Sequence, residues 1–140
     1  MNDSIGKMIS ILQRKAQSYY TKFLKDYGIS SAEYPVLFYL NGRDGVTQDE
    51  IVTELSIDKG AVTRILQSLS DKQMIERKKD DFDHRCNRIF LTELGKETHK
   101  PVHQAKENWN TILTKHMSDK EEKELTRLLS LAIQNLNESL

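Results

Sequence analysis

Residues 58–72, DKGAVTRILQSLSDK, decide the fold of this chain. Asp58 is a favourable N-cap, and the residues that follow it predict a helix over about 59–72. At about 100° per residue, one side of this helix is apolar and the opposite side is small or polar. The apolar side, which should be buried, holds Val62, Ile65, Leu66 and Leu69. The opposite, exposed side holds Gly60, Thr63, Arg64 and Gln67.

A short helix and a tight turn precede this helix. Thr47 and Glu50 have the spacing of a capping box. The helix that they open should bury Ile51, Val52 and Leu55. The turn 56–58 then joins the two helices into a helix-turn-helix. Because the major groove of DNA admits one helix, and Arg, Gln and Thr can pair with base edges there, we expect the second helix to read DNA. The alternative is a polar side that is merely solvated.

A basic β-hairpin is predicted directly after the second helix. Its strands are residues 75–79 and 87–91, and its loop is 80–85. Residues 77–88 hold five Lys or Arg against three Asp, so positive charge is concentrated there. An Arg near the tip of a protruding arm can enter a narrow minor groove, where negative potential is high. We expect Arg85 to do so. Asp83 should hold Arg85, or an Arg of the recognition helix, through a carboxylate to guanidinium fork.

The local charge matters because the whole chain is neutral, with 21 basic and 21 acidic residues. A neutral protein binds nucleic acid only where its positive charge is segregated. The alternative is that the hairpin is an ordinary solvated run of charge. The candidate DNA-binding residues are Lys59, Gly60, Thr63, Arg64, Gln67, Arg77, Lys79, Asp83, Arg85 and Arg88.

These motifs resemble the MarR family of winged helix-turn-helix transcription regulators. The family's wing signature, Asp-x-Arg followed by Leu-Thr-x-x-Gly, appears as Asp83–Arg85 and Leu91–Gly95, behind a helix that contains Ala61–Arg64. The resemblance covers nearly the whole chain. It implies a mainly α fold with a small β-hairpin wing, and a DNA-binding repressor released by a small-molecule effector. One departure is Gln73, where the family usually has Gly; a left-handed backbone there would cost Gln roughly 1 kcal/mol.

Length and composition agree with one MarR-type domain over 1–140. Of the 140 residues, 37% are hydrophobic and 30% are charged, as in ordinary soluble domains. No apolar run approaches the roughly 20 residues that span a bilayer, and the N-terminus lacks the features of a signal peptide. We therefore expect a cytoplasmic protein that does not contact the membrane. The lone Cys86 cannot form an internal disulfide, which agrees with a reducing compartment.

Long amphipathic helices should flank the DNA-binding part, which spans about 30–92. Apolar residues recur every three or four positions through most of 4–27, and this first helix should end at Gly28, a natural left-handed C-cap. Ser30 and Glu33 then form a capping box that opens a second helix. That helix carries Val36, Leu37 and Leu40.

Residues 93–140 should form two more long helices. Thr92 caps the first, and Pro101 should kink it. Ser118 and Glu121 open the second, whose apolar stripe holds Leu125, Leu128, Leu129, Ala132, Ile133 and Leu136. This stripe and the apolar face of 4–27 exceed what the DNA-binding part can cover, so we expect a homodimer built from both termini. Its operator would be a pseudo-palindrome. The alternative is packing entirely within one chain.

Aromatic residues indicate a possible effector pocket. We expect Tyr39 and the candidate pocket residues to converge where the first, second and fifth helices meet. The resemblance implies a pocket there for small aromatic anions, whereas the alternative is simple core packing. The candidate pocket residues are Tyr19, Tyr20, Phe23, Tyr34, Phe38 and Trp109.

A regulator of the same fold that senses a metal or an oxidant is an alternative function. His99 and His103 have the spacing of two helical metal ligands, but Tyr34 occupies the place where the resemblance implies a third, so we expect solvated histidines and no metal. Cys86 lies in the wing, away from the place of the family's reactive Cys, and should pack. If it is exposed, Arg85 and Arg88 would lower its pKa.

An enzyme is not expected. The chain has no Gly-rich phosphate loop, nucleophile motif or plausible carboxylate pair, and we predict no cofactor. A stronger alternative is a winged-helix module that binds protein in place of DNA. The neutral charge favours that alternative, whereas Arg64, Gln67 and Arg85 at DNA-facing positions argue against it.

Overall fold

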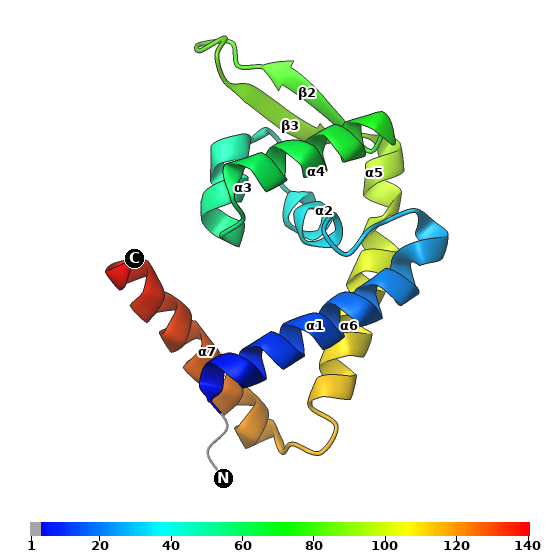
Figure 1. The fold of residues 1–140 in the computed structure, drawn as a ribbon. Helices are drawn as coiled ribbons and strands as arrows, with labels where there is room; N and C mark the ends of the chain where they lie inside the picture. The colour runs from blue at the N-terminus through cyan, green and yellow to red at the C-terminus, as the bar shows by residue number, and fades with distance from the viewer. Residues whose placement is uncertain (1–3) are drawn as a thin grey trace. The chain divides into compact units, whose positions relative to one another are not determined.

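The computed structural model describes residues 4–140 and divides into two compact units, with the boundary after Lys106. The first unit contains α1 (Ile5–Leu24), η1 (Lys25–Tyr27), α2 (Tyr34–Leu40), β1 (Val46–Thr47), α3 (Gln48–Leu55), α4 (Lys59–Asp71), β2 (Ile75–Lys79), β3 (Asn87–Leu91) and α5 (Glu93–Glu97) (Figure 1). Helix α6 (His99–Leu113) crosses the boundary, and α7 (Asp119–Ser139) lies in the second unit. The predicted mainly α fold with a small wing is confirmed. That the two units act as one domain stays a prediction.

The first helical segment ends at the predicted signal, Gly28, and begins at a cap that was not predicted. Ser4 is its N-cap and accepts a hydrogen bond from the Lys7 N–H at 3.0 Å. The last turn tightens into the 3₁₀ helix η1, and Gly28 ends it with a left-handed φ of 70°. Glycine tolerates that conformation because it has no Cβ. The predicted helix over most of 4–27 is therefore one α-helix followed by one 3₁₀ turn.

The Ser30–Glu33 box forms, but it lies ahead of the second helix. The Ser30 N–H donates to Glu33 Oε1 at 2.9 Å, and the Glu33 N–H donates to Ser30 Oγ at 3.1 Å. Residues 31–33 form a turn, and α2 begins at Tyr34 with Pro35 in its first turn. Proline is tolerated there because few backbone bonds are lost. Val36, Leu37 and Leu40 are buried, as predicted.

The β-hairpin has the predicted bounds and gains a third strand. The sheet is antiparallel in the order β1-β3-β2, and Ile89 pairs with Val46 on one side and with Arg77 on the other. Val46, Ile75 and Ile89 are buried, so this end of the sheet packs on the core. The sequence did not predict β1, because two residues carry no readable alternation. Its pairing attaches the base of the wing to the segment before α3.

The core of the first unit forms around α4. Val62, Ile65, Leu66 and Leu69 are all buried, which confirms the apolar side predicted for this helix. They join buried residues of the other elements, namely Tyr20, Leu24, Ile29, Val36, Leu37, Leu40, Val46, Ile51, Met74, Ile75, Ile89, Val102 and Ala105. Because one side of α4 is held in this core, its opposite side faces solvent.

The Leu-Thr-x-x-Gly motif joins the wing to α5. Thr92 caps α5, since its Oγ1 accepts from the Gly95 N–H at 3.1 Å, and it also donates to the Gln73 carbonyl at 2.6 Å. A Cβ at Gly95 would collide with the backbone carbonyl of Met74, so only glycine fits there. Gln73 itself is left-handed, with φ 62°. The chain therefore places a non-glycine residue in the strained conformation that was anticipated.

A break separates α5 from α6 at Thr98. Pro101 has no N–H to donate to the Glu97 carbonyl four residues earlier, and its ring would clash with that carbonyl in a regular helix. The helix is therefore interrupted there. The Thr98 side chain instead donates to the Gly95 carbonyl at 2.6 Å. One kinked helix was predicted after Thr92, whereas the structure has two separate helices, α5 and α6.

The second unit is dominated by α7. Ser118 and Glu121 form the predicted capping box, with bonds of 2.9 and 3.1 Å. No α7 residue is buried. Exposed apolar side chains along the helix are Leu128, Leu129, Leu131, Ile133 and Leu136.

Candidate nucleic-acid interface

Helix α4 presents its polar side to solvent. Asp58 caps it, accepting from the Ala61 N–H at 2.9 Å, and the preceding turn needs a left-handed Ser56 with φ 52°. Gly60, Thr63, Arg64 and Gln67 are exposed, as the periodicity predicts, and so are Lys59 and Asp71 at the two ends of the helix. A Cβ at Gly60 would lie 3.4 Å from the Arg64 guanidinium. The small residue therefore leaves room for Arg64 to reach back over the first turn.

Two exposed residues of α4 that were predicted to face DNA, Thr63 and Gln67, have internal partners that the sequence did not suggest. Gln48, the first residue of α3, donates to Thr63 Oγ1 at 2.7 Å, and Thr63 donates to the Lys59 carbonyl. Gln67 accepts from Arg77 of β2 at 3.0 Å and donates to Asp71 at 2.8 Å. Arg77 and Gln67 were each predicted to contact DNA. Their hydrogen bond also connects β2 of the wing to α4. Gln67 must exchange these partners before its amide can pair with an adenine.

In the wing, Asp83 holds Arg85, one of the two partners expected. Oδ1 of Asp83 accepts from the Arg85 backbone N–H at 3.0 Å and from Arg85 Nε at 3.1 Å. The contact uses one side-chain nitrogen, so it is not the two-nitrogen fork that was expected. The Arg85 side chain is 92% exposed. Its side-chain and backbone hydrogen bonds hold the pKa of Asp83 below the ordinary range.

Asp80 organises the wing loop and was missed from the sequence. Its backbone N–H donates to the Cys86 carbonyl at 2.9 Å, its Oδ2 accepts from the Asp83 N–H, and its Oδ1 pairs with Arg88 Nε at 3.2 Å. Arg88 also donates to the Gly45 carbonyl at 2.9 Å. The signal was available, because Asp at the start of a turn commonly binds backbone N–H groups. Arg88, predicted to contact DNA, therefore also fastens the wing to the segment before β1.

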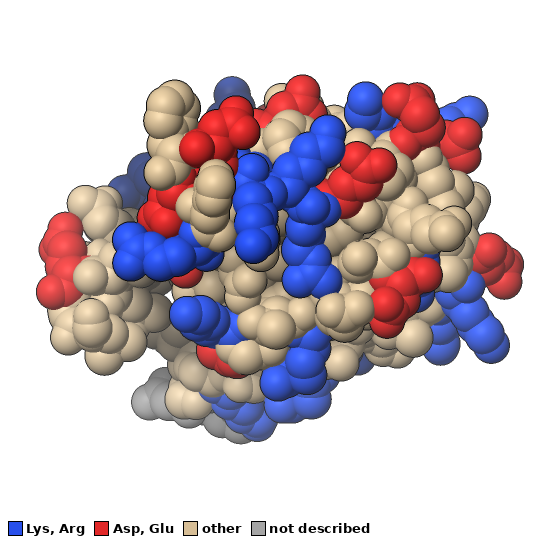
Figure 2. Space-filling model, turned by 90° about the horizontal axis from the view of Figure 1, so that it is seen from above, with Lys and Arg blue, Asp and Glu red and all other residues tan. Residues whose placement is uncertain are grey.

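Positive charge is concentrated where these elements meet. Lys59 of α4 and Arg85 of the wing line the same hollow of about 150 Å³, beside the first residues of α3. Lys79 is exposed at the end of β2. Seen from the side on which the hairpin lies, Lys and Arg side chains lie in the middle of the face with Asp and Glu beside them, and further Lys and Arg lie at its edges (Figure 2). Basic side chains of α4 and of the wing therefore lie close together on a chain of zero net charge.

The expectations for Cys86 are wrong. Cys86 is exposed, so it does not pack in the core. Its thiol lies near Asp83, at 3.7 Å from Oδ2, and the negative charge of Asp83 raises the pKa of Cys86. The expected lowering by Arg85 and Arg88 does not occur because those guanidinium groups are directed to Asp83 and Asp80. Cys86 is therefore protonated at neutral pH, and a protonated thiol is less reactive than a thiolate.

Tyr20 and Tyr34, two of the six candidate pocket residues, line the same cavity. Tyr20 and Tyr34 stack with ring centroids 3.8 Å apart, beside a cavity of about 260 Å³ between α1 and the start of α2. Burial and the hydrogen bond with Tyr34 raise the pKa of Tyr20. The cavity is lined by Gln13, Ala16, Gln17, Tyr20, Ser31, Ala32, Tyr34 and Pro35.

Tyr19 and Phe23 continue this aromatic cluster, because the Tyr19 ring lies edge-on to the Tyr20 ring, with centroids 5.2 Å apart. Tyr19 stacks on Phe23 and donates to the Ala105 carbonyl, and Phe38 contacts Lys106. Tyr39 donates to Glu50 at 2.6 Å, so it does not join a common cluster. Trp109 belongs to the second unit.

His99 and His103 are exposed neighbours on α6. Their ring centroids lie 5.6 Å apart. Across residues 4–140, no group of three or more His, Cys, Asp and Glu side chains is arranged to hold a metal ion. No helix in the same part of the chain has the length and apolar character to cross a membrane.

Comparison with known proteins places this arrangement among transcription regulators. The model of the MarR family matches residues 27–85. A MarR transcriptional regulator from Methanosarcina mazei Go1, known from its crystal structure, is 35% identical; the match covers 97% of this chain and 98% of that one, with a TM-score of 0.90. The HTH-type transcriptional regulator BilQ of Clostridioides difficile is 28% identical over 127 residues, which are 91% of this chain and 86% of that protein. A MarR family regulator from Listeria monocytogenes, solved with a 26mer DNA, has the same fold at 22% identity, with a TM-score of 0.92 over 99% of this chain and 92% of that one.

Proposed function

Because the chain belongs to the MarR family of transcriptional regulators, we propose that it binds a pseudo-palindromic DNA operator as a homodimer and represses transcription there. The exposed polar side of α4 supports this proposal most directly. It lies opposite a fully buried apolar side and next to a basic wing. A helix held in this way can enter the major groove while the wing reaches the adjacent minor groove. Such a regulator acts in the cytoplasm, on chromosomal DNA.

The side chains divide into three roles in this proposal. Thr63 and Arg64 read bases, because they are exposed near the start of α4. Arg85 enters the minor groove, and Asp83 keeps it directed outward. The remaining residues contact phosphates or bring the backbone close to DNA, and these are Lys59, Gly60, Gln67, Arg77, Lys79 and Arg88.

Two apolar surfaces support assembly as a dimer. Along α1, Ile5, Met8, Ile9 and Leu12 are exposed by 42–73%. Along α7, the five exposed apolar residues described above recur at helical spacing. Contiguous apolar surface of this kind mostly marks an interface. A two-fold dimer would place two recognition helices about 34 Å apart, one turn of DNA.

The α1–α2 cavity is the candidate effector site. Its lining combines the Gln13 and Gln17 amides, the Ser31 hydroxyl and the stacked Tyr20 and Tyr34 rings. Those groups suit a small aromatic molecule with hydrogen-bonding substituents. We therefore propose that such an effector releases the protein from DNA.

DNA binding is tested with duplexes selected from a random-sequence pool by the protein itself. We expect a palindromic consensus, and log affinity should fall linearly with log salt by about 0.9 for each phosphate contacted. The variant Arg64→Ala, with Arg14→Ala in the exposed part of α1 as the control, should bind the selected duplex more weakly. No enrichment of any sequence, or affinity that does not vary with salt, would overturn the proposal.

A further inference from the structure

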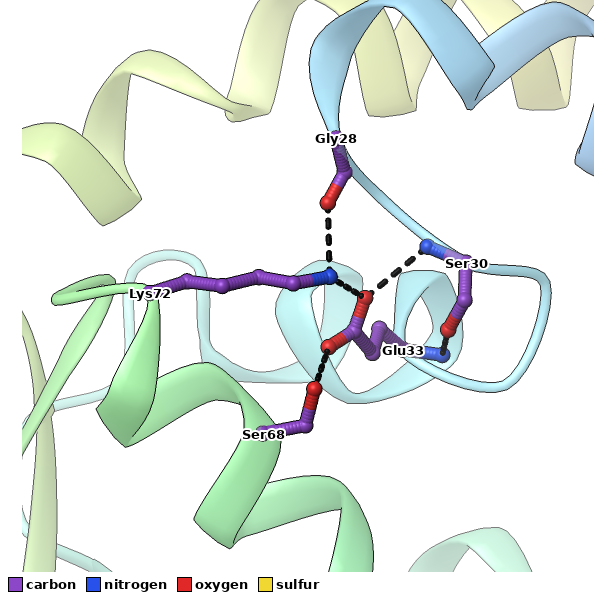
Figure 3. Close-up of polar contacts among 5 residues, drawn as sticks. All are labelled: Gly28, Ser30, Glu33, Ser68 and Lys72. Atoms are coloured by element: carbon purple, nitrogen blue, oxygen red, sulfur yellow. Dashed lines mark hydrogen bonds and ion pairs between the residues drawn. The ribbon is translucent and has the colours of Figure 1, made fainter.

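Glu33 is a buried carboxylate that joins three segments of the chain. The residue is 2% exposed, and donors reach it from the turn before α2 and from α4 (Figure 3). Its Oε1 accepts from the Ser30 N–H at 2.9 Å and from Lys72 Nζ at 2.6 Å, and its Oε2 accepts from the Ser68 hydroxyl at 2.7 Å. Lys72 Nζ also donates to the Gly28 carbonyl at 2.7 Å. Both carboxylate oxygens of Glu33 therefore accept hydrogen bonds. The donors come from the turn before α2 and from the C-terminal end of α4.

The cluster is better suited to fixing geometry than to adding stability. Burial by itself raises the pKa of Glu33, but the hydrogen bonds from Lys72, Ser30 and Ser68 outweigh it and lower the pKa, so Glu33 is ionised at neutral pH. The desolvation of a buried ion pair largely offsets its attraction, and an apolar pair of similar volume is often as stable. An apolar pair, however, has no preferred direction. Hydrogen bonds hold the distance and angle between the segments that they join.

The helix side of the cluster lies next to the DNA-facing residues. Ser68 follows Arg64 by four positions, so the two side chains are neighbours on α4. A groove of about 300 Å³ runs beside them. One side of it is lined by Ser30, Ala32 and Glu33, and the other by Ala61, Arg64, Ile65 and Ser68. A change in how Glu33 holds Ser68 therefore changes the surroundings of Arg64.

We propose that Glu33 is a positioning residue for DNA recognition. By holding Ser68 and Lys72, it fixes the rotation of α4 against the turn that precedes α2, and thereby the direction in which Arg64 projects. The inference rests on the proposed DNA-binding function and adds a residue that does not touch DNA. The Ser30–Glu33 box ahead of α2 does not account for the cluster, since the box uses only Ser30 and leaves Ser68 and Lys72 unexplained.

A second capping box supplies a matched control. In α7, Ser118 and Glu121 form the same reciprocal bonds, at 2.9 and 3.1 Å, as Ser30 and Glu33. Replacing Glu121 therefore removes a capping box without removing a tie to α4. The comparison between the two glutamates isolates what Glu33 does beyond capping.

The experiment measures affinity for the selected duplex, melting temperature and the ¹H–¹⁵N spectrum of the free protein. Ser68→Ala should weaken binding by up to about fivefold, the limit reached if the whole free energy of one hydrogen bond serves to orient α4, and Ser68→Thr should restore it. The double variant Glu33→Met with Lys72→Met should weaken binding about tenfold while it melts within a few degrees of wild type, because the ion pair is replaced by an apolar pair. Backbone signals of Ala61 and Arg64 should shift in both variants before DNA is added. Glu121→Met removes the cap of α7 and can lower the melting temperature, but it should leave the affinity for the duplex and the signals of Ala61 and Arg64 unchanged.

Each result bears on the proposal. If the double variant and Ser68→Ala bind the duplex as wild type does, or if Ala61 and Arg64 do not shift, Glu33 is not a positioning residue. If the double variant unfolds, Ser68→Ala and Ser68→Thr decide alone, because they leave the ion pair in place. If the wild-type protein selects no duplex at all, the proposed DNA binding is wrong, and the spectra still report whether Glu33 orients α4.

Discussion

The variant Asp83→Ala tests whether the wing carboxylate orients Arg85. Asp83 binds both the backbone N–H and Nε of Arg85, whose side chain is otherwise 92% exposed. Removing a negative charge near DNA should strengthen binding if charge alone matters. Removing a tether should weaken it. The two explanations therefore predict opposite signs.

The tether should have the larger effect. A single charge about 10 Å from a phosphate in water changes affinity by less than about twofold once salt screens it. An Arg side chain that is fully free must lose its rotational freedom on binding, which lowers affinity by up to roughly tenfold. In the free protein, Oδ1 of Asp83 already restricts the rotation of the Arg85 side chain, so less rotational freedom is lost when DNA binds. The expected net result is a Kd about threefold higher for Asp83→Ala than for wild type.

Fluorescence anisotropy on the selected duplex across a salt series measures this effect. Asp81→Ala is the matched control, because Asp81 is an exposed carboxylate in the same loop and its loss reports the charge effect alone. Arg85→Ala should flatten the salt slope by about 0.9, equivalent to one phosphate. If Asp83→Ala binds as tightly as Asp81→Ala or more tightly, the orienting role is refuted and Asp83 only repels.

Three further predictions concern recognition, assembly and strain. Arg64→Ala should cost about 1 to 3 kcal/mol on the selected duplex and reduce discrimination between sequences; competition with point-mutated duplexes measures this, and unchanged selectivity would exclude base reading. Leu129→Asp should place an unpaired charge in the dimer interface and abolish both dimerisation and operator binding, whereas Ser130→Asp on the polar side of α7 should do neither; a dimeric Leu129→Asp in sedimentation would contradict the proposed interface. Gln73→Gly should raise the melting temperature by about 3 °C, because it relieves roughly 1 kcal/mol of left-handed strain in a chain of this size; an unchanged or lower value in calorimetry would show that Gln73 is not strained.

The sequence by itself determined the elements that depend on neighbours within one helical turn or one strand pair. The two sides of α4 follow from residue spacing, and the predicted caps at Asp58 and Ser118 are bonds to residues three positions away. The hairpin bounds follow from a continuous run of strand residues around a polar loop. These features are local, so the order of residue types suffices to predict them.

Only the tertiary structure decided which distant groups meet. Lys72 reaches Glu33 across 39 positions, Arg88 reaches the Gly45 carbonyl across 43, and Arg77 and Gln67 bond across an intervening turn. The same limit explains the errors about Cys86, because its exposure and its raised pKa depend on where the folded wing directs Asp83 and the nearby Arg side chains. A charged residue can pair with any of several residues of opposite charge along the chain. Its neighbours in the sequence therefore do not identify the partner. That choice is made when the apolar side of α4 enters the core, because this brings the turn before α2 and strand β2 of the wing to the same C-terminal half of the helix, at Ser68, Lys72 and Gln67.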